Sequence, residues 1–307
     1  MGIYRFAIVF YNEHSGQCNS LQPRGKIEQY LEDHQIKYHI ILVPQAKDKL
    51  RAEVAALIQE GADLAIAAGG DGTVTIASDL LMTHDLPLII LPLGTGNLLA
   101  KELHIPQRLE SALELITSDH NRSFILDTFS CNNQFYVMNL SVGVSSQIME
   151  LTPTEEKKRF GFLAYFRHFL EQLLGLELKK TIIQHDGKSE SFMASEVMIT
   201  NSRLIAVNPL EWAEDVFLDD GVLDLFIVRA ANISDIVGFV HSVFTKSVWQ
   251  NPIVHHFKIR ENCRIETSHA LPVQADGDLV GMTPVEVTVH PQSLKVLVPA
   301  SEVGKIR

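Results

Sequence analysis

Two glycine-rich turns in the sequence are suited to binding phosphate groups. Each follows an apolar stretch and precedes a helix-like stretch: Gly69–Thr73 follows Leu64–Ala68, and Gly94–Asn97 follows Leu88–Leu91. Glycine lets backbone N–H groups approach phosphate oxygens closely, and the amino end of the following helix adds a partial positive charge. Neither turn fits the P-loop or the dinucleotide-binding fingerprint. A phosphate site of another kind is one interpretation, and a tight turn capped by Thr73 is the other.

Three further polar turns carry groups with catalytic potential. Asn12–Gly16 ends the first apolar stretch and would lie at the same edge of a parallel sheet as the glycine-rich turns, although a plain loop is the simpler interpretation. Leu218–Asp224 and Gln274–Asp278 combine carboxylates with glycine. Such clusters suit a hard cation such as Mg²⁺ or a base that accepts a hydroxyl proton, and Asp-Gly is equally the commonest turn of a β-hairpin.

Composition and charge restrict the class of protein. The chain has 307 residues, of which 46% are apolar and 21% are charged, as in globular proteins with a sizeable core. Its net charge of -11 disfavours nucleic acid as a partner, because binding a phosphate backbone needs a surplus of Lys and Arg. Cys18, Cys131 and Cys263 are too few and too widely spaced for a disulfide framework or a zinc site, which favours a cytoplasmic protein.

The elements that must position these turns alternate in the first third of the chain. Short apolar stretches separated by helix-like stretches predict repeated βα units and a parallel sheet. Ligands of such sheets bind at the carboxyl ends of the strands, where the glycine-rich turns fall. The predicted strands are Tyr4–Phe10, Tyr38–Val43, Leu64–Ala68 and Leu88–Leu91, and the predicted helices are Gln22–His34, Asp48–Glu60, Val74–Thr83, Leu98–Leu103 and Leu109–Thr117.

After about Phe124 the pattern changes to β-rich segments, which predict a second, mostly β domain. Helical insertions interrupt it at Glu155–Leu174 and Ile233–Ser247. We expect an α/β domain over residues 1–124 and a β domain over residues 125–294, with the tail 295–307 free to pack back on the first domain. The predicted strands of this part are Gln134–Ser141, Thr181–His185, Ala194–Thr200, Leu223–Val228 and Val285–Pro299, with a hairpin turn at His185–Lys188.

Taken together and in this order, the five turns resemble the diacylglycerol kinase catalytic family, which includes sphingosine and ceramide kinases and soluble bacterial lipid kinases. The most specific elements are the GGDGT run at Gly69–Thr73 and the GTGN run at Gly94–Asn97, which is followed by Ala100 and Lys101. The resemblance spans nearly the whole chain. It implies an N-terminal α/β nucleotide-binding domain with a parallel sheet, a C-terminal β-sandwich domain for the lipid substrate, and an active site in the cleft between them.

The resemblance also implies roles for individual residues. Asp278 would be the general base, and Asp71 would organise the Mg²⁺ of the nucleotide. A structural Mg²⁺ would be held by the Asp220 carboxylate and the carbonyls of Phe217 and Val222. Lys101 would offset phosphate charge. The residues expected to bind ATP are Asn12, Ser15, Gly16, Gly69, Gly70, Asp71, Gly72, Thr73, Val74, Thr75, Gly94, Thr95, Gly96, Asn97 and Lys101.

Three positions depart from the usual pattern of the family. Glu13 stands where the first turn usually has a proline, which loosens that turn. Leu98 stands where many relatives have an aspartate that links the metal to the active site. Asp278 stands where a glutamate is frequent, so its shorter side chain must lie closer to the hydroxyl of the substrate.

The sequence thus predicts a Mg²⁺-dependent kinase that transfers the γ-phosphoryl group of ATP to a hydroxyl of diacylglycerol or a related lipid. We expect a cytoplasmic enzyme that contacts the membrane surface transiently, and Phe160–Leu174, with its aromatic face and basic flank, is one candidate for that contact. A core or dimer-interface helix is the simpler interpretation of the same segment, and a homodimer stays open. The alternatives are a kinase of a soluble hydroxyl compound, similar to NAD kinases, and a non-catalytic nucleotide-binding regulatory protein.

Overall fold

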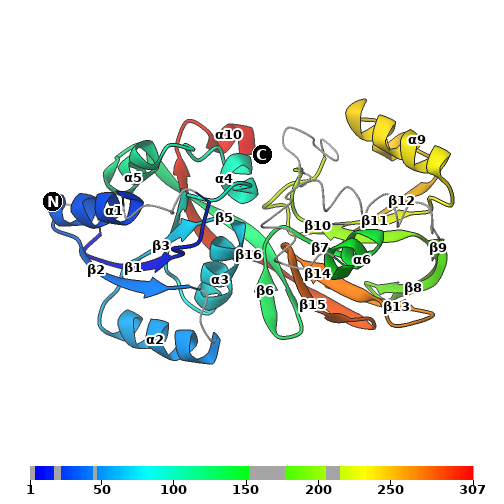
Figure 1. Cartoon of the computed structure of the whole chain (residues 1–307), viewed down its shortest axis with the longest axis horizontal. Coiled ribbons are helices and arrows are strands. Elements are labelled where there is room, and N and C mark those ends of the chain that lie inside the picture. The colour runs from blue at the N-terminus through cyan, green and yellow to red at the C-terminus, as the bar shows by residue number, and fades with distance from the viewer. Residues whose placement is uncertain (1–3, 17–21, 44–46, 152–176, 205–214, 307) are drawn as a thin grey trace. The chain divides into compact units, whose positions relative to one another are not determined.

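The chain folds into two compact units (Figure 1). The structure, a computed structural model, describes residues 4–16, 22–43, 47–151, 177–204 and 215–306. The first unit comprises Met1–Asp127 and Gln292–Arg307, and the second comprises Thr128–Pro291. The predicted helix Glu155–Leu174 lies outside the described residues.

The first unit is built on a parallel sheet with the strand order β2-β1-β3-β4. The end of β16 (Val285–Pro299) continues the sheet beside β4, where Val296 pairs with Leu88. Every residue of β1, β3 and β4 is buried, as expected of parallel strands covered on both faces. The predicted parallel sheet is confirmed. Its strands are β1 (Phe6–Tyr11), β2 (Lys37–Leu42), β3 (Leu64–Gly69) and β4 (Leu88–Pro92).

Helices cover the sheet of the first unit. One pair of contacting helices is α1 with α5 and another is α2 with α3, and Figure 1 shows the two pairs on opposite faces of the sheet. Helix α5, for example, buries an apolar stripe that includes Leu113 and Ile116. The helices are α1 (Gln22–Asp33), α2 (Lys47–Gln59), α3 (Asp71–Leu81), α4 (Leu98–Glu102), α5 (Leu109–Thr117) and the C-terminal α10 (Val303–Ile306).

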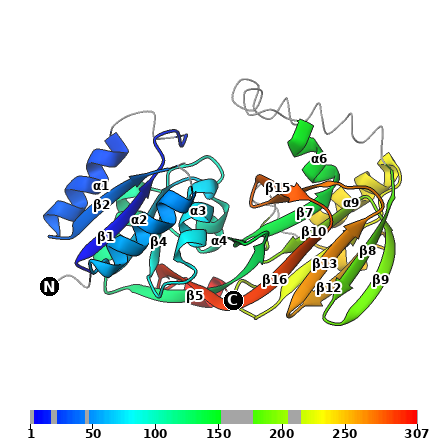
Figure 2. The same cartoon turned by 90° about the horizontal axis from the view of Figure 1, so that it is seen from below.

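The second unit is an antiparallel β-sandwich, as predicted (Figure 2). One sheet has the order β12-β11-β10-β7-β14-β15, and the other contains the first part of β16, then β13, β8 and β9, with β5 and β6 beside β16. The strands are β5 (Asn121–Cys131), β6 (Gln134–Tyr136), β7 (Asn139–Gly143), β8 (Lys179–His185), β9 (Lys188–Ala194), β10 (Glu196–Thr200), β11 (Leu223–Val228), β12 (Val254–Ile259), β13 (Asn262–Thr267), β14 (Pro272–Ala275) and β15 (Asp278–Met282).

Alternating side chains of the two sheets form the core of the sandwich. In β16 the buried residues Val285, Val287 and Val289 are spaced by two, as are Leu223 and Leu225 in β11. This period places one face of each strand in the core. Helices α6 (Val144–Leu151) and α9 (Ile233–Phe244) and the short η1 (Val248–Gln250) complete the described part of this unit. No helix in the described parts of either unit is long and apolar enough to cross a membrane.

Two strands predicted as continuous are interrupted. Gln134–Ser141 is divided between β6 and β7, and Ala194–Thr200 is divided between β9 and β10 at Ser195. The Ser195 hydroxyl donates to the carbonyl of Val228 and accepts the N–H of Ala230, so side-chain bonds add to the backbone bond from the Ser195 N–H to Val228 at this break. Periodicity alone does not reveal such breaks, because the residues on both sides alternate as a strand does.

Candidate active site

The three parallel strands β1, β3 and β4 are neighbours in the sheet and end in the three polar turns of the first unit. The N–H of Asn12 donates to the carbonyl of Ala68 at 3.2 Å, which extends the pairing of β1 with β3 into the first turn. The hydroxyl of Ser15 accepts the N–H of Gly70 at 3.3 Å. The first and second predicted turns therefore lie against each other, as the parallel topology requires.

The second and third turns also touch, and their glycines make this contact possible. A Cβ added to Gly94 would lie 2.4 Å from Cα of Gly70, and a Cβ added to Gly96 would lie 2.5 Å from a carboxylate oxygen of Asp71. A Cβ on Gly16 in the first turn would lie 3.0 Å from the hydroxyl oxygen of Thr95 in the third. The three turns thus form one cluster at the carboxyl edge of the sheet.

Asn97 fixes the shape of the third turn. Its backbone adopts the left-handed conformation, with φ of 51°, which asparagine tolerates better than most residues. Its side-chain amide accepts the N–H of Gly94 and donates to the carbonyl of Gly94, both at 2.9 Å. The asparagine of the GTGN run therefore closes the turn on itself.

Asp71 connects the second turn to the third. Its carboxylate accepts the N–H of Leu98 at 2.6 Å, at the first residue of α4. Burial raises the pKa of Asp71, and backbone hydrogen bonds from Leu98 and Asn97 oppose that shift. The carboxylate thus has a structural partner that the sequence pattern did not indicate.

Glycine backbone contributes to the surface of this cluster. Gly72 is exposed, and a Cβ added to it would meet no other atom within 4 Å. Thr73 and Val74 are buried, and both of their N–H groups donate to the carbonyl of Gly70. Helix α3 begins after Gly70 without a side-chain cap, so the N–H of the exposed Gly72 in its first turn can pair with solvent or an anion.

Two other predicted residues of the first unit lie beside this cluster in the sequence. Thr75, on α3, donates its hydroxyl hydrogen bond to the carbonyl of Asp71 at 3.2 Å. Lys101, half-buried on α4, forms no ion pair with any residue that the structure describes. Its ammonium group is thus available to a ligand.

Glu13 replaces the usual proline with an ionic contact. Its carboxylate lies 3.7 Å from the guanidinium of Arg24 on α1, and Arg24 also contacts Glu28 at 3.0 Å. All three side chains are partly exposed, so the contact contributes little stability. The turn itself is closed by Asn12, whose side-chain oxygen accepts the N–H of His14 at 2.9 Å.

In the second unit, the turn at Asp276 joins β14 to β15 as a hairpin, with φ of 46° at Asp276 and 90° at Gly277. Three backbone N–H groups donate to the Asp276 carboxylate, those of Val137, Met138 and Asn139, at 2.9–3.0 Å. These donors lie where the predicted strand Gln134–Ser141 breaks. Asp276 is therefore a structural clamp between the hairpin and β7.

Asp278 differs from Asp276 although it lies only two residues further along the chain. It is exposed at the first residue of β15, and its carboxylate has no hydrogen-bond or ion-pair partner among the described residues. A carboxylate without a structural partner remains available to accept a proton. The geometry therefore distinguishes Asp276 from Asp278, two carboxylates of the Gln274–Asp278 turn that the sequence left as candidates for the general base.

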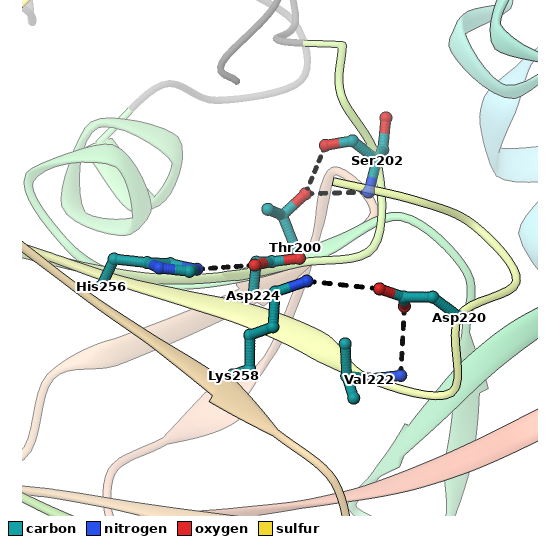
Figure 3. Close-up of polar contacts among 7 residues, drawn as sticks. All are labelled: Thr200, Ser202, Asp220, Val222, Asp224, His256 and Lys258. Atoms are coloured by element: carbon teal, nitrogen blue, oxygen red, sulfur yellow. Dashed lines mark hydrogen bonds and ion pairs between the residues drawn. The ribbon is translucent and has the colours of Figure 1, made fainter. Parts of the chain in front are cut away.

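The turn at Asp220 precedes β11 (Figure 3). One carboxylate oxygen of Asp220 accepts the N–H of Val222 and the other accepts the ammonium of Lys258, both at 3.3 Å. Gly221 has φ of 77°, a conformation that favours glycine. The described residues contain no cluster of three or more His, Cys, Asp or Glu side chains suited to a metal ion. A cation here would therefore depend on one carboxylate and backbone carbonyls such as those of Phe217 and Val222.

A buried acid-histidine pair close to this turn was not predicted. The Asp224 carboxylate is 1% exposed and lies 2.6 Å from Nε2 of His256 (Figure 3). The ring of His256 packs edge-on against Trp249. The signal in the sequence was an aspartate inside the apolar strand Leu223–Val228, because a buried carboxylate needs a partner. Its partner on β12 is distant in sequence and became visible only through strand pairing.

The fold and the site define a class of protein: a parallel α/β domain with clustered glycine-rich turns, followed by an antiparallel β-sandwich. Residues 6–127 match the family model of the diacylglycerol kinase catalytic domain. Residues 138–298 match that of the YegS C-terminal NAD kinase beta sandwich-like domain. The chain belongs to the diacylglycerol kinase-like family in which these two domains follow one another, which confirms the resemblance found in the sequence.

Relatives match the chain along its length. An uncharacterized protein of Synechocystis sp. is 27% identical over 305 residues, which cover 95% of this chain and 70% of the relative. A protein of Staphylococcus aureus strain Newman with the provisional name of lipid kinase is 27% identical, covering 96% of this chain and 97% of the relative. The crystal structure of a diacylglycerol kinase from Bacillus anthracis str. Sterne has a TM-score of 0.79 at 24% identity, covering 99% of this chain and 100% of that chain, and it demonstrates a shared fold.

Proposed function

We propose that this protein transfers the γ-phosphoryl group of ATP to a hydroxyl of diacylglycerol or a related lipid, with MgATP as the phosphate donor. The observation that carries the proposal is the cluster of three turns at one edge of the parallel sheet, with Gly70 at its centre. Its backbone surface and the adjoining amino end of α3 suit a polyphosphate. Membership of the diacylglycerol kinase-like family supports the same chemistry.

A cavity of the first unit is suited to the nucleoside part of ATP. It has a volume of about 370 Å³ and is lined from the starts of α1 and α5 and by Leu93, the residue before the third turn. This volume lies in the usual range of small-molecule sites. Apolar contact from Leu93 and Pro23 and polar groups such as Gln107 would together accommodate a purine.

The chemistry requires one base and little else from the protein. In phosphoryl transfer, catalysis consists mainly of positioning and of neutralising charge. Asp278 would accept the proton of the acceptor hydroxyl as its oxygen attacks the γ-phosphorus, and the bond to the bridging oxygen of ADP would break. Lys101 would offset negative charge on the phosphates, and Asp71 would hold the second and third turns in register.

The Asp220 turn is the proposed site of a structural Mg²⁺. Oxygen ligands are what this cation prefers, and the turn offers the Asp220 carboxylate with nearby carbonyls. Lys258 neutralises the same carboxylate, with an N–O distance of 3.3 Å, so its ammonium would have to move aside. The donor set therefore fits a cation that competes with a lysine.

Removing the Asp220 carboxylate and removing the Lys258 ammonium should change the effect of Mg²⁺ on the melting temperature in opposite directions. A ligand that binds only the folded state raises the melting temperature, so Mg²⁺ should stabilise the wild type and have almost no effect on Asp220→Ala. Lys258→Met removes the competing ammonium and should lower the Mg²⁺ concentration needed for a half-maximal shift by up to about fivefold, since an exposed ion pair contributes up to about 1 kcal/mol. Thermal unfolding across a Mg²⁺ titration measures all three proteins. Equal shifts in all of them would place the cation elsewhere.

The function itself is tested by transfer of labelled phosphate. The protein is incubated with γ-labelled ATP, Mg²⁺ and a panel of lipids that includes diacylglycerol, and the organic phase is separated by chromatography. Label in one lipid supports the proposal. Label transferred only to NAD⁺ in a parallel incubation would support the kinase of a soluble compound instead, which the name of the β-sandwich family makes a specific alternative. ATP binding without transfer to any acceptor would indicate a regulatory protein.

A further inference from the structure

The second unit contains a carboxylate that the proposed reaction does not use. Glu196, at the start of β10, is half-buried in the wall of a cavity of about 110 Å³. The cavity lies wholly within this unit, and its walls include apolar side chains such as Val142 and Leu271. A carboxylate in such surroundings requires specific hydrogen bonds.

Helix α6 supplies these bonds. The N–H of Ser145 donates to one Glu196 oxygen at 3.0 Å, and the Ser145 hydroxyl donates to the other. Gly143 leaves room for the carboxylate, because a Cβ there would lie 2.8 Å from Oε2 of Glu196. Both the first residues of α6 and the glycine before it are therefore arranged around this side chain.

The hydrogen bonds continue from Glu196 to the hairpin that carries Asp278. The Ser145 hydroxyl lies 2.6 Å from that of Ser141, which accepts a hydrogen bond from the side-chain amide of Gln274 at 2.8 Å. The carbonyl oxygen of the same amide accepts the N–H of Gly277 at 3.1 Å. Gly277 is the residue immediately before Asp278, so this series of hydrogen bonds ends at the backbone next to the proposed base.

The charge of Glu196 determines which group donates in each of these hydrogen bonds. When the carboxylate is ionised, Ser145 must donate to it, Ser141 donates to Ser145, and Gln274 donates to Ser141. Each bond then strengthens the next. When the carboxyl group is protonated it becomes a donor itself, and the two serine hydroxyls are no longer held in one orientation. The side-chain amide of Gln274 is then held less firmly by its hydrogen bond to Ser141.

We propose that Glu196 is a positioning residue for Asp278, acting through Ser145, Ser141 and Gln274 on the backbone of Gly277. The proposal rests on the proposed function, in which Asp278 is the base. Gln274 pairs directly with Ser141 across β14 and β7, and both residues are buried, so the connection is part of the sheet.

Glu196 changes its charge in the neutral range. Burial raises the pKa of Glu196 to about 7, and the hydrogen bonds from Ser145 only partly oppose this shift. The other charged groups lining the cavity are Glu177 and Lys179, which form an ion pair with an N–O distance of 3.5 Å. Because that pair is close to neutral as a whole, it leaves burial as the dominant influence on Glu196.

The kinetic test compares Glu196→Gln with the wild type across pH. Glutamine keeps the size of the side chain but resembles the protonated form at every pH. At saturating ATP and lipid, the ratio of wild-type to variant kcat should be near one at pH 5.5 and should rise about fivefold by pH 8.5, the effect of one hydrogen bond. Taking the ratio removes the titration of ATP, which both proteins share. Glu177→Gln, the matched change at an exposed carboxylate of the same cavity, should give a ratio that does not vary with pH. A flat ratio for Glu196→Gln would overturn the proposal.

A second test does not need activity. In the wild type, the amide resonance of Gly277 should shift between pH 5.5 and 8.5 with the same midpoint as the carboxyl carbon of Glu196. Glu196→Gln should abolish this shift, and Ser141→Ala should abolish it while Glu196 still titrates. A Gly277 resonance that stays constant while Glu196 titrates would overturn the proposal. If the resonance titrates but no lipid is phosphorylated, the hydrogen-bond chain is supported and the proposed function fails.

Discussion

Replacing Asp278 by asparagine should lower kcat for lipid phosphorylation by roughly 10²–10⁴-fold, the usual contribution of a positioned general base. Asparagine has almost the same size but accepts no proton. The Asp278 side chain is exposed and has no partner among the described residues, so the melting temperature should change little. ATP affinity should be retained. Steady-state kinetics, nucleotide binding and thermal unfolding on the same preparation measure the three quantities.

Asp276→Asn is the matched control for this variant. The Asp276 carboxylate accepts three backbone N–H groups with its two oxygens. Asparagine would replace one of these oxygens by an NH₂ group, which is a donor and cannot accept an N–H. Leaving a partly buried N–H without an acceptor costs about 1–3 kcal/mol, so this variant should lose stability. Normal turnover in Asp278→Asn together with inactive but fully stable Asp276→Asn would assign the base to Asp276 and would contradict the structural distinction between them.

Adding one methyl group at Gly94 should damage the nucleotide site far more than adding it at Gly72. The new Cβ of Gly94→Ala would lie 2.4 Å from Cα of Gly70, a contact between two backbones that no side-chain rotation can relieve. We expect a loss of about 3 kcal/mol in the free energy of unfolding, the upper part of the usual range for overpacking. ATP binding should be lost with the contact between the turns. Denaturant titration and calorimetric nucleotide binding measure both effects.

Gly72→Ala provides the comparison, because its Cβ would meet no protein atom within 4 Å. The variant should be at least as stable as the wild type, since alanine favours the first turn of a helix over glycine. If phosphate lies against this backbone, ATP affinity should fall about tenfold or more, the loss of one hydrogen bond to a charged group. Unchanged ATP affinity in a stable Gly72→Ala protein would exclude this face as the phosphate site. Gly70→Ala is less informative, because a Cβ there would already lie 3.2 Å from Cα of Gly94.

Local sequence determined the elements and the turns that end them. The predicted strands Leu64–Ala68 and Leu88–Leu91 are each only one residue shorter than β3 and β4, because continuous apolar runs bounded by glycine or proline leave few alternatives. The hairpin at His185–Lys188 is confirmed for a similar reason, since Asp186 and Gly187 tolerate positive φ, here 45° and 79°. The order of the motifs along the chain was also sufficient to identify the family.

Tertiary structure decided what each polar side chain contacts. Asp276 and Asp278 occupy the same turn in the sequence, but only the fold brings the N–H groups of residues 137–139 to Asp276 and leaves Asp278 without a partner. Asp71 likewise accepts the N–H of Leu98, a residue 27 positions away. The conformation of a turn depends on residues that are adjacent in sequence, so the sequence alone predicts it. The partner of a carboxylate is fixed by strands and turns that are distant in the chain and are brought together only when their apolar faces are buried.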